Sequence, residues 1–249
     1  MSSTVIERAA FLLSQCSQPS AFTGAGISKE SGLPTYRDSS DALWNDPKIR
    51  RLATVAGLHE TPDEVRRYFA SFRAQVQAAR PNAGHDALFE LEAWSLGLPI
   101  ITQNVDDLHE RAGSRQVIHL HGNVLQDRCS RYCRGVPSVV ETGEGVVTCP
   151  WCGAATRPNV TLFGEYVHGE PLSLATQVAE QTDLMLIVGT TGIVAPALDI
   201  PKTARQSGAT LIEINPNPTA VTPLVDLAIP MSAGEALPLI VRAFLQMIA

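Results

Sequence analysis

Four short apolar runs, each followed by a polar or glycine-containing turn, constrain the fold of this 249-residue chain most strongly. These runs lie at 21–23, 98–102, 184–188 and 210–214. Around and between them are stretches that favour helices, at 5–14, 83–96 and 171–181. Buried strands that alternate with helices are typical of a parallel sheet covered on both faces. We therefore predict an α/β fold with a Rossmann-like, doubly wound parallel sheet, whose ligand crevice lies at the carboxyl ends of the strands.

Four of the five cysteines lie close together in a segment that has no long apolar run. Three residues separate Cys129 from Cys133, fifteen follow, and two separate Cys149 from Cys152. This spacing matches a four-thiolate zinc site, in which each cysteine pair presents two sulfurs to one ion. Because such a closed site leaves no position for substrate, we predict one structural zinc ion that holds the segment folded. Two disulfides, unpaired thiols or another metal such as iron remain the alternatives.

Two segments do not fit the alternation of strands and helices. Residues 39–80 have the pattern of a loop followed by charged helices, and 127–157 are rich in cysteine, glycine and arginine. We interpret both as insertions that form a smaller lobe beside the sheet. The predicted Rossmann-like domain comprises 1–38, 83–125 and 158–249. The predicted small lobe combines a helical insertion at 39–82 with a zinc-binding module at 126–157.

Charge and hydropathy narrow the range of partners. The formal net charge is −6 and the pI is about 5.5, which gives no basic surface of the kind that binds nucleic acid. No apolar run approaches the roughly 18 residues of a membrane span, and the first residues lack the features of a signal peptide. We therefore expect a cytoplasmic protein that binds neither nucleic acid nor a membrane.

The first predicted strand runs directly into the loop Gly24-Ala25-Gly26-Ile27-Ser28. Glycines after a strand let backbone N–H groups approach a phosphate, but the third glycine of the usual dinucleotide fingerprint is replaced here by Lys29. A lone G-x-G is more often a tight turn. The polar stretch continues to residue 38, however, which is too long for a hairpin turn, so we interpret it as a binding loop.

This loop and several later segments together resemble the signature motifs of the sirtuin family. The matching segments are GAGISKESGLPTYR at 24–37, TQNVD at 102–106, LH at 108–109, AG at 112–113, HLHGN at 119–123, the four cysteines, RPNVTLFGE at 157–165, GTT at 189–191 and NPNPT at 215–219. They occur in the family's order and span about residues 20–220.

The resemblance implies an enzyme that removes acyl groups, most simply acetyl, from lysines of proteins or peptides. It implies that NAD is consumed: the acyl oxygen attacks the ribose C1′ as nicotinamide leaves, and the products are lysine, nicotinamide and O-acyl-ADP-ribose. His121 and Asn104 would be the catalytic residues. A histidine suits the role of general base because its unperturbed pKa of about 6.5 lets it accept a ribose hydroxyl proton at neutral pH.

The resemblance also assigns binding roles. The residues implied to bind NAD are Gly24, Ala25, Gly26, Ser28, Tyr36, Arg37, Gln103, Asn104, Asp106, Gly189, Thr190, Thr191, Asn215 and Ala233. Among them, Asp106 would accept hydrogen bonds from the nicotinamide carboxamide, and Ala233 would lie near the adenine. An extended substrate peptide would pair with the segment containing Val160, Phe163, Gly164 and Glu165, by strand addition.

The sequence departs from the family pattern in its expected acyl pocket. Sirtuins that prefer succinyl or malonyl groups carry Tyr-x-x-Arg on the helix after the binding loop, whereas the nearest register here is Ala70-Ser71-Phe72-Arg73. We therefore expect no dedicated desuccinylase. Ala70 would leave room for a longer apolar acyl chain. Arg73 is expected either to contact the substrate or to be a solvated surface residue.

Other functions and other roles for single residues remain to be weighed. The first alternative is that the same fold transfers ADP-ribose to a protein. A non-catalytic NAD sensor, a zinc-ribbon interaction module or an NAD-linked oxidoreductase fits fewer of the motifs. His119 is interpreted as structural. The groups interpreted as solvated or capping are His85, Asp107, His109 and the side chain of Glu165.

Overall fold

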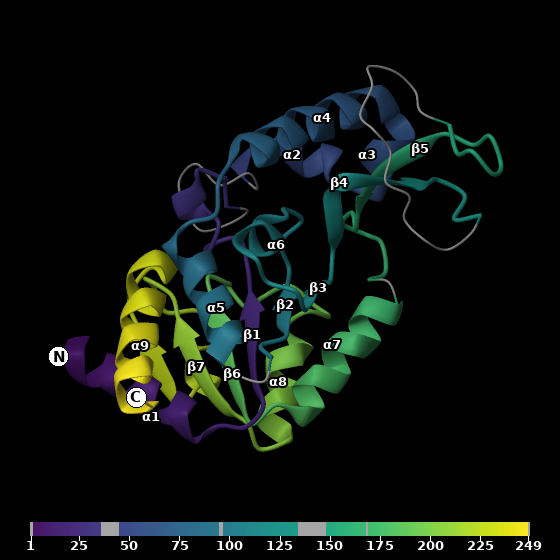
Figure 1. The fold of residues 1–249 in the computed structure, drawn as a ribbon. Coiled ribbons are helices and arrows are strands. Elements are labelled where there is room, and N and C mark those ends of the chain that lie inside the picture. Colours follow the sequence, from purple (N-terminus) through teal and green to yellow (C-terminus); the bar gives the residue numbers. More distant parts are fainter. Residues whose placement is uncertain (1, 36–44, 95–96, 134–147, 168, 249) are drawn as a thin grey trace.

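A six-stranded parallel sheet forms the centre of the computed structural model, which describes residues 2–35, 45–94, 97–133, 148–167 and 169–248 (Figure 1). The strand order is β3-β2-β1-β6-β7-β8. Their bounds are Pro19–Thr23 for β1, Ile100–Thr102 for β2, Val117–His119 for β3, Leu184–Val188 for β6, Thr210–Ile214 for β7 and Leu227–Ile229 for β8. The predicted α/β fold is thus confirmed.

Helices cover both faces of the sheet, as Figure 1 shows. One face carries α1 (Ser2–Gln15), α5 (Ala83–Trp94) and α9 (Ala233–Ile248), and the other carries α7 (Gly169–Gln181) and α8 (Asp199–Gln206). Side chains of β6 alternate between the two cores: Leu184, Leu186 and Val188 face one, Met185 and Ile187 the other. Burial on both faces explains why these strands are continuously apolar.

The strand order reverses between β1 and β6. The chain proceeds from β1 to β2 and β3 on one side, then returns to β6, β7 and β8 on the other. Thr23 pairs with both Thr102 and Val188, so β1, β2 and β6 end at the same level. The loops that follow these three strands therefore converge at a topological switch point, where open α/β sheets bind their ligands.

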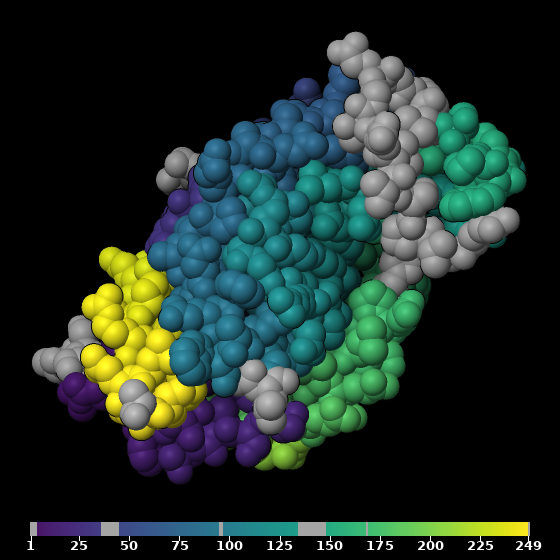
Figure 2. Space-filling model, in the orientation of Figure 1, coloured from purple at the N-terminus to yellow at the C-terminus, as the bar shows by residue number. Residues whose placement is uncertain are grey.

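A smaller lobe extends from this end of the sheet. It contains α2 (Pro47–Leu52), α3 (Val55–Glu60), α4 (Pro62–Ala78) and an antiparallel pair, β4 (Gly122–Cys129) and β5 (Thr156–Val160). Its own apolar core joins Phe69 and Val76 of α4 to Val124 of β4 and Val160 of β5. In Figure 2 this lobe and the surface of α9 lie at opposite ends of an elongated molecule.

The remaining short elements connect these parts. They are α6 (Leu108–Ala112) and the 3-10 helices η1 (Lys29–Ser31) and η3 (Thr222–Leu224). Among the residues that the structure describes, no helix has the length and apolar character needed to cross a membrane.

Candidate functional site

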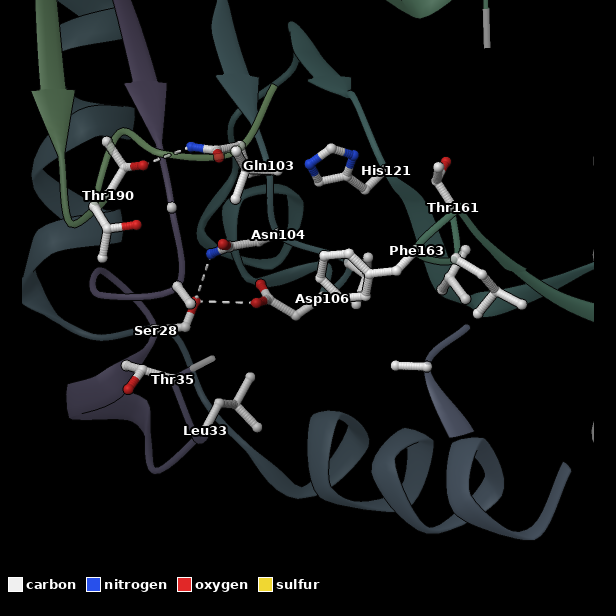
Figure 3. A pocket seen from close by; sticks show the side chains of 18 of the residues that line it. Ser28, Leu33, Thr35, Gln103, Asn104, Asp106, His121, Thr161, Phe163 and Thr190 are labelled. Carbon is white, nitrogen blue, oxygen red and sulfur yellow. Dashed lines mark hydrogen bonds between the residues drawn. The ribbon is translucent and has the colours of Figure 1, made fainter. Parts of the chain in front are cut away.

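A cavity of about 230 Å³ lies where the loops after β1, β2 and β6 meet the small lobe (Figure 3). Most residues that the sequence assigns to NAD or substrate line it. These are Gly24, Ala25, Gly26, Ser28, Gln103, Asn104, Asp106, His121, Val160, Phe163, Gly164, Glu165, Gly189, Thr190 and Thr191. Residues from five separate segments of the sequence therefore converge on one space.

Three glycines, Gly24, Gly26 and Gly189, allow the backbones of the loops after β1 and β6 to contact each other directly. The Gly26 N–H donates to the Gly189 carbonyl at 2.8 Å. A Cβ on Gly24 would lie 2.8 Å from that oxygen, and one on Gly26 would lie 2.7 Å from the Gly189 Cα. Gly189 itself has a φ of +61°, which favours glycine. In this structure the glycines of the binding loop thus serve close loop packing, whereas the sequence suggested only an approach to phosphate.

A buried polar network forms the base of the cavity. The Asn104 amide donates to the Ser28 hydroxyl oxygen at 3.0 Å, and the Ser28 hydroxyl donates to Asp106 Oδ2 at 3.0 Å. Asp106 Oδ1 accepts the N–H of Leu108, which begins α6. Burial raises the pKa of the Asp106 carboxyl, although these hydrogen bonds oppose the shift. Asn104, Ser28 and Asp106 therefore hold one another in fixed positions (Figure 3).

A second contact joins the loops after β2 and β6. The Gln103 amide donates to Thr190 Oγ1 at 2.8 Å. The side-chain amide of Asn215, which follows β7, donates to the Thr190 backbone carbonyl at 3.1 Å. Asn215 is buried and is not among the residues described as lining the cavity. Its role in this structure is to fix the Thr190 backbone.

Like Asn215, Ala233 is an expected NAD-binding residue that is not among those lining the cavity. Ala233 begins α9, where it is 5% exposed and packs against Gly84. Tyr36 and Arg37 fall outside the described residues. Their roles stay predictions.

His121 follows β3 and lines the cavity opposite Asn104 and Asp106 (Figure 3). Its carbonyl accepts the Thr161 N–H at 2.8 Å, which ties it to the segment after β5. The next residue, Gly122, has a φ of +83°, and a Cβ there would meet the Asn159 carbonyl at 2.0 Å. Burial lowers the pKa of His121 to about 4, below the unperturbed value assumed from the sequence. The imidazole is therefore neutral across the physiological pH range.

The side chain of Glu165 fastens the segment at 160–165. The expectation that this side chain is solvated or capping was wrong. This carboxylate is 16% exposed and accepts from Arg128 and Arg157, both at 2.9 Å, and from the Leu162 N–H at 2.8 Å. Two arginines and one peptide N–H thus hold the loop that lines the cavity, while Arg157 also donates to the Val160 carbonyl.

The structure corrects the expectations for Arg73 and Ala70. Arg73 is only 9% exposed and is absent from the cavity lining as described. Its guanidinium donates to the Val124 carbonyl and to Asp127, both at 2.7 Å, which joins α4 to β4. Arg73 is therefore not a solvated surface residue, and its contact with a substrate stays a prediction. Ala70 is exposed, so it does not shape the cavity either.

Phe69 and Phe72 line the cavity in their place, and the sequence analysis missed both. The signal was present, because Val65, Phe69, Phe72 and Val76 recur at helical spacing and define the buried face of α4. The sequence-based expectation concerned Ala70 and Arg73, each of which follows one of these phenylalanines by one position.

His85 and His109 are also not solvated, contrary to expectation. They are 0% and 1% exposed, and their ring centroids lie 4.9 Å apart in an edge-to-face arrangement. His109 Nε2 donates to the Thr23 hydroxyl oxygen at 3.0 Å, because the Thr23 hydroxyl itself donates to Thr102 Oγ1 at 2.9 Å. Burial lowers the pKa of His85 to about 4 and that of His109 well below its usual value. Both rings are neutral beneath the site.

Buried neutral histidines make the fold sensitive to acid. The unfolded chain binds protons at a histidine pKa of about 6.5, whereas folded His85 binds them only at about 4, so stability is lost as pH falls between these values. In the His85→Asn variant, the new amide oxygen can still accept the Asn82 N–H. Between pH ~7 and ~4.5, we expect the free energy of unfolding of this variant to fall by about 2–3 kcal/mol less than that of wild type. Urea unfolding at both pH values measures this difference. Equal losses in wild type, His85→Asn and the exposed-histidine control His59→Asn would contradict it.

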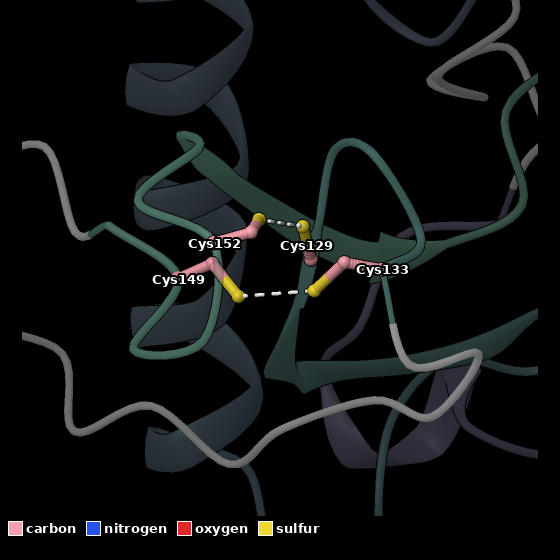
Figure 4. Close-up of side chains that lie close together, drawn as sticks. All are labelled: Cys129, Cys133, Cys149 and Cys152. Atoms are coloured by element: carbon pink, nitrogen blue, oxygen red, sulfur yellow. Dashed lines mark hydrogen bonds between the residues drawn. The ribbon is translucent and has the colours of Figure 1, made fainter.

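The four predicted metal ligands lie together in the small lobe (Figure 4). All four Sγ atoms of Cys129, Cys133, Cys149 and Cys152 lie within 4.8 Å of one another. The closest Sγ–Sγ distances are 3.5 Å, for Cys129–Cys152 and Cys133–Cys149. A tetrahedron with Zn–S bonds of about 2.3 Å has edges of about 3.8 Å, so the arrangement fits one tetrahedral zinc ion. No disulfide joins any of the four cysteines.

These features define a doubly wound α/β protein with a polar cavity at its switch point and a four-cysteine cluster in an inserted lobe. The Sir2 family model matches residues 24–196. An NAD-dependent protein deacylase of Pyrococcus abyssi is 40% identical over 244 residues, which cover 96% of this chain and 97% of the relative. The chain belongs to the Sir2 family, as its motifs indicated.

Solved structures agree with this assignment. A Sir2 homologue in complex with ADP-ribose is 36% identical, with a TM-score of 0.91, and the match covers 97% of each chain. A Sir2 protein bound to an acetylated peptide is 30% identical, with a TM-score of 0.81, over 94% of this chain and 95% of that one. The likeness therefore extends over nearly the whole chain.

Proposed function

We propose that this protein is an NAD-dependent protein-lysine deacylase that yields lysine, nicotinamide and O-acyl-ADP-ribose. One observation carries the proposal: a neutral histidine, His121, lines the same cavity as the network of Asn104, Ser28 and Asp106. A buried base facing fixed amide, hydroxyl and carboxylate groups suits a reaction that positions a polar ligand and removes one proton from it.

The polar groups of the cavity fit NAD. Asp106 presents a buried carboxylate that suits the N–H groups of a carboxamide, and Gln103 and Thr190 present groups that suit ribose hydroxyls. The loop after β1 begins at the switch point, where pyrophosphates bind in related sheets. We assign the nicotinamide end to Asn104 and Asp106, and the phosphates and adenosine to Gly24–Ser28, Gly189–Thr191 and Asn215. NAD supplies the ribose carbon to which the acyl oxygen is transferred.

His121 would act as the general base. Because its pKa is about 4, the ring is neutral at physiological pH and can accept a proton. A low pKa also makes the ring a weak base, so its effectiveness must come from position. The backbone carbonyl of His121 accepts the Thr161 N–H. This bond fixes the backbone of His121 relative to the segment that would hold the peptide.

The substrate would enter beside the segment at 160–165. This segment lines the cavity, and Glu165 fastens it to Arg128 and Arg157, so it would present the peptide to the cavity from a fixed position. Val160, Phe163, Gly164 and Glu165 line the cavity there. We assign the acyl-lysine to the channel between Phe163 and the side chains of α4.

The acyl end of this channel favours neutral groups. Phe69, Phe72 and Leu162 give it apolar walls, and the titratable acids of the cavity are Asp106 and Glu165. Among the lining residues that the structure describes, none is lysine or arginine. A succinyl carboxylate would lose its hydration without gaining a cation, which is costly in an apolar site.

The proposal is tested by nicotinamide release from NAD with matched acetyl-, butyryl-, myristoyl- and succinyl-lysine peptides. We expect turnover with neutral acyl groups and at least a ten-fold lower kcat/KM for succinyl, equivalent to about 1.4 kcal/mol or more. Phe72→Arg should narrow that gap, whereas Phe72→Met, which keeps an apolar side chain, should not. No release with any peptide would contradict deacylation, and preferred release with succinyl would contradict the assignment of the acyl channel.

We further propose one structural zinc ion held by the four cysteines, away from the chemistry. The ion would keep β4 and β5 joined to the loops beyond them and would take no part in the reaction. The cytoplasmic location and the lack of nucleic-acid and membrane partners stay predictions from the sequence.

A further inference from the structure

Both ring nitrogens of His119 face hydrogen-bond acceptors. His119 ends β3, and its Nδ1 lies 3.0 Å from the Asn104 carbonyl oxygen. Its Nε2 lies 2.7 Å from Glu110 Oε1, on α6. The side chain of His119 is 15% exposed and that of Glu110 is 39% exposed. The ring is thus enclosed between a peptide oxygen and a carboxylate.

This arrangement fixes the protonation state of the ring. A carbonyl oxygen accepts only, so Nδ1 must carry a hydrogen, and an ionised carboxylate also accepts only, so Nε2 must carry one as well. The ring is therefore an imidazolium. Burial alone lowers the pKa of His119, but the hydrogen bond and charge of Glu110 outweigh it and leave the pKa raised. The same bond lowers the pKa of Glu110, against the effect of its own burial.

The Asn104 peptide is held from both directions. Its N–H donates to Thr102 Oγ1 at 3.0 Å, and its carbonyl accepts from His119. These two bonds fix the backbone of Asn104, from which its side-chain amide donates to Ser28 in the cavity. We propose that His119 and Glu110 are positioning residues. His119 orients Asn104 for the reaction by donating to the Asn104 backbone carbonyl, and Glu110 holds the His119 ring in place.

This inference rests on the proposed function, because it assigns its effect to Asn104. The other charged or titratable groups near His119 come from several elements. They include Asp106 in the loop before α6 and neutral His109 on α6. Others line a second cavity of about 530 Å³ together with His119, and these are Arg128, Cys129, Tyr132, Cys133 and Glu170. Glu110 is the one that hydrogen-bonds the ring.

Two substitutions of His119 separate its two hydrogen bonds. The amide nitrogen of asparagine lies where Nδ1 lies in histidine, and that of glutamine lies where Nε2 lies. His119→Asn therefore keeps the donor toward Asn104, whereas His119→Gln keeps only the donor toward Glu110. We expect His119→Gln to lower kcat about ten-fold, as for one hydrogen bond from a charged donor, with little change in the KM for the peptide. His119→Asn should retain most of the wild-type kcat.

The pH profile gives a readout that a merely structural role would not change. As pH rises through the folded pKa of His119, the ring should keep the hydrogen on Nε2, which faces the Glu110 carboxylate, and lose the one on Nδ1. The hydrogen bond to the Asn104 carbonyl is then lost, and wild-type kcat should fall. Glu110→Gln removes the charge that raises this pKa, so the fall should move to lower pH. His119→Asn should lack it altogether.

The outcomes distinguish this inference from the proposed function. If wild type releases no nicotinamide with any acyl peptide, the proposed function fails and the His119 variants are not needed to show it. If wild type is active but His119→Gln and His119→Asn have equal kcat and unshifted profiles, the positioning role fails alone. Thermal unfolding of each variant checks that a lost kcat is not lost folding; equal melting temperatures with unequal kcat support the proposal.

Discussion

Replacement of His121 by alanine is expected to abolish most acyl-dependent nicotinamide release while the protein still folds and binds NAD. His121 is the one imidazole that lines the cavity with Asn104 and Asp106, in the part of the chain that the structure describes. A positioned general base contributes about 10²–10⁴-fold to a rate, so kcat should fall by at least about 100-fold. Initial rates with an acetyl-lysine peptide measure the loss.

Binding must be separated from chemistry in this variant. NAD should still raise the melting temperature of His121→Ala, because the loops after β1, β2 and β6 are unchanged. His59→Ala, on the exposed side of α3, serves as the matched histidine control and should keep wild-type kcat. A kcat for His121→Ala within a few-fold of wild type would remove His121 from the chemistry.

The second large effect is expected from loss of the four-cysteine cluster. Cys149→Ser removes one ligand. Among the described residues of the segment 126–157, none belongs to the apolar core of the lobe, so the bound metal should contribute several kcal/mol to folding. For a chain of this size, such a loss lowers the melting temperature by about 10 °C or more. Metal content by mass spectrometry and thermal unfolding measure the two consequences together.

The control for this change is Cys16→Ser, because Cys16 is half-buried on the other lobe and is not part of the cluster. It should keep one zinc per chain and most of the stability. A strong chelator should reproduce the effect of Cys149→Ser in wild type. Unchanged stability after complete removal of the metal would show that the ion does not hold the lobe together.

The sheet was predictable because its strands are buried on both faces. β6 and β7 begin and end at the predicted residues, since continuous apolar runs between turns mark such strands clearly. β3 and β8 were not predicted, because three residues are too few to show any periodicity. β4 and β5 were missed because they carry Arg128 and Arg157, whose burial depends on the distant Glu165.

The site residues likewise fall into those that a local motif identifies and those whose roles depend on distant partners. Loop residues at the ends of the strands were identified from their motifs, and the structure brings them together at one cavity. The roles of Arg73, His85 and His119 depend on partners far along the chain or on packing between elements, which a local pattern does not reveal. The residue ranges of the two lobes stay predictions.

Transfer of the acyl group to the ribose of NAD is expected to accompany its loss from lysine. The most direct test incubates the wild-type protein with NAD and one acetyl-lysine peptide, then quantifies nicotinamide, deacetylated peptide and O-acetyl-ADP-ribose by mass spectrometry. We expect the three products in equal amounts. Nicotinamide formed while the peptide keeps its acetyl group, with ADP-ribose attached to protein, would contradict deacylation and identify an ADP-ribosyltransferase on the same fold.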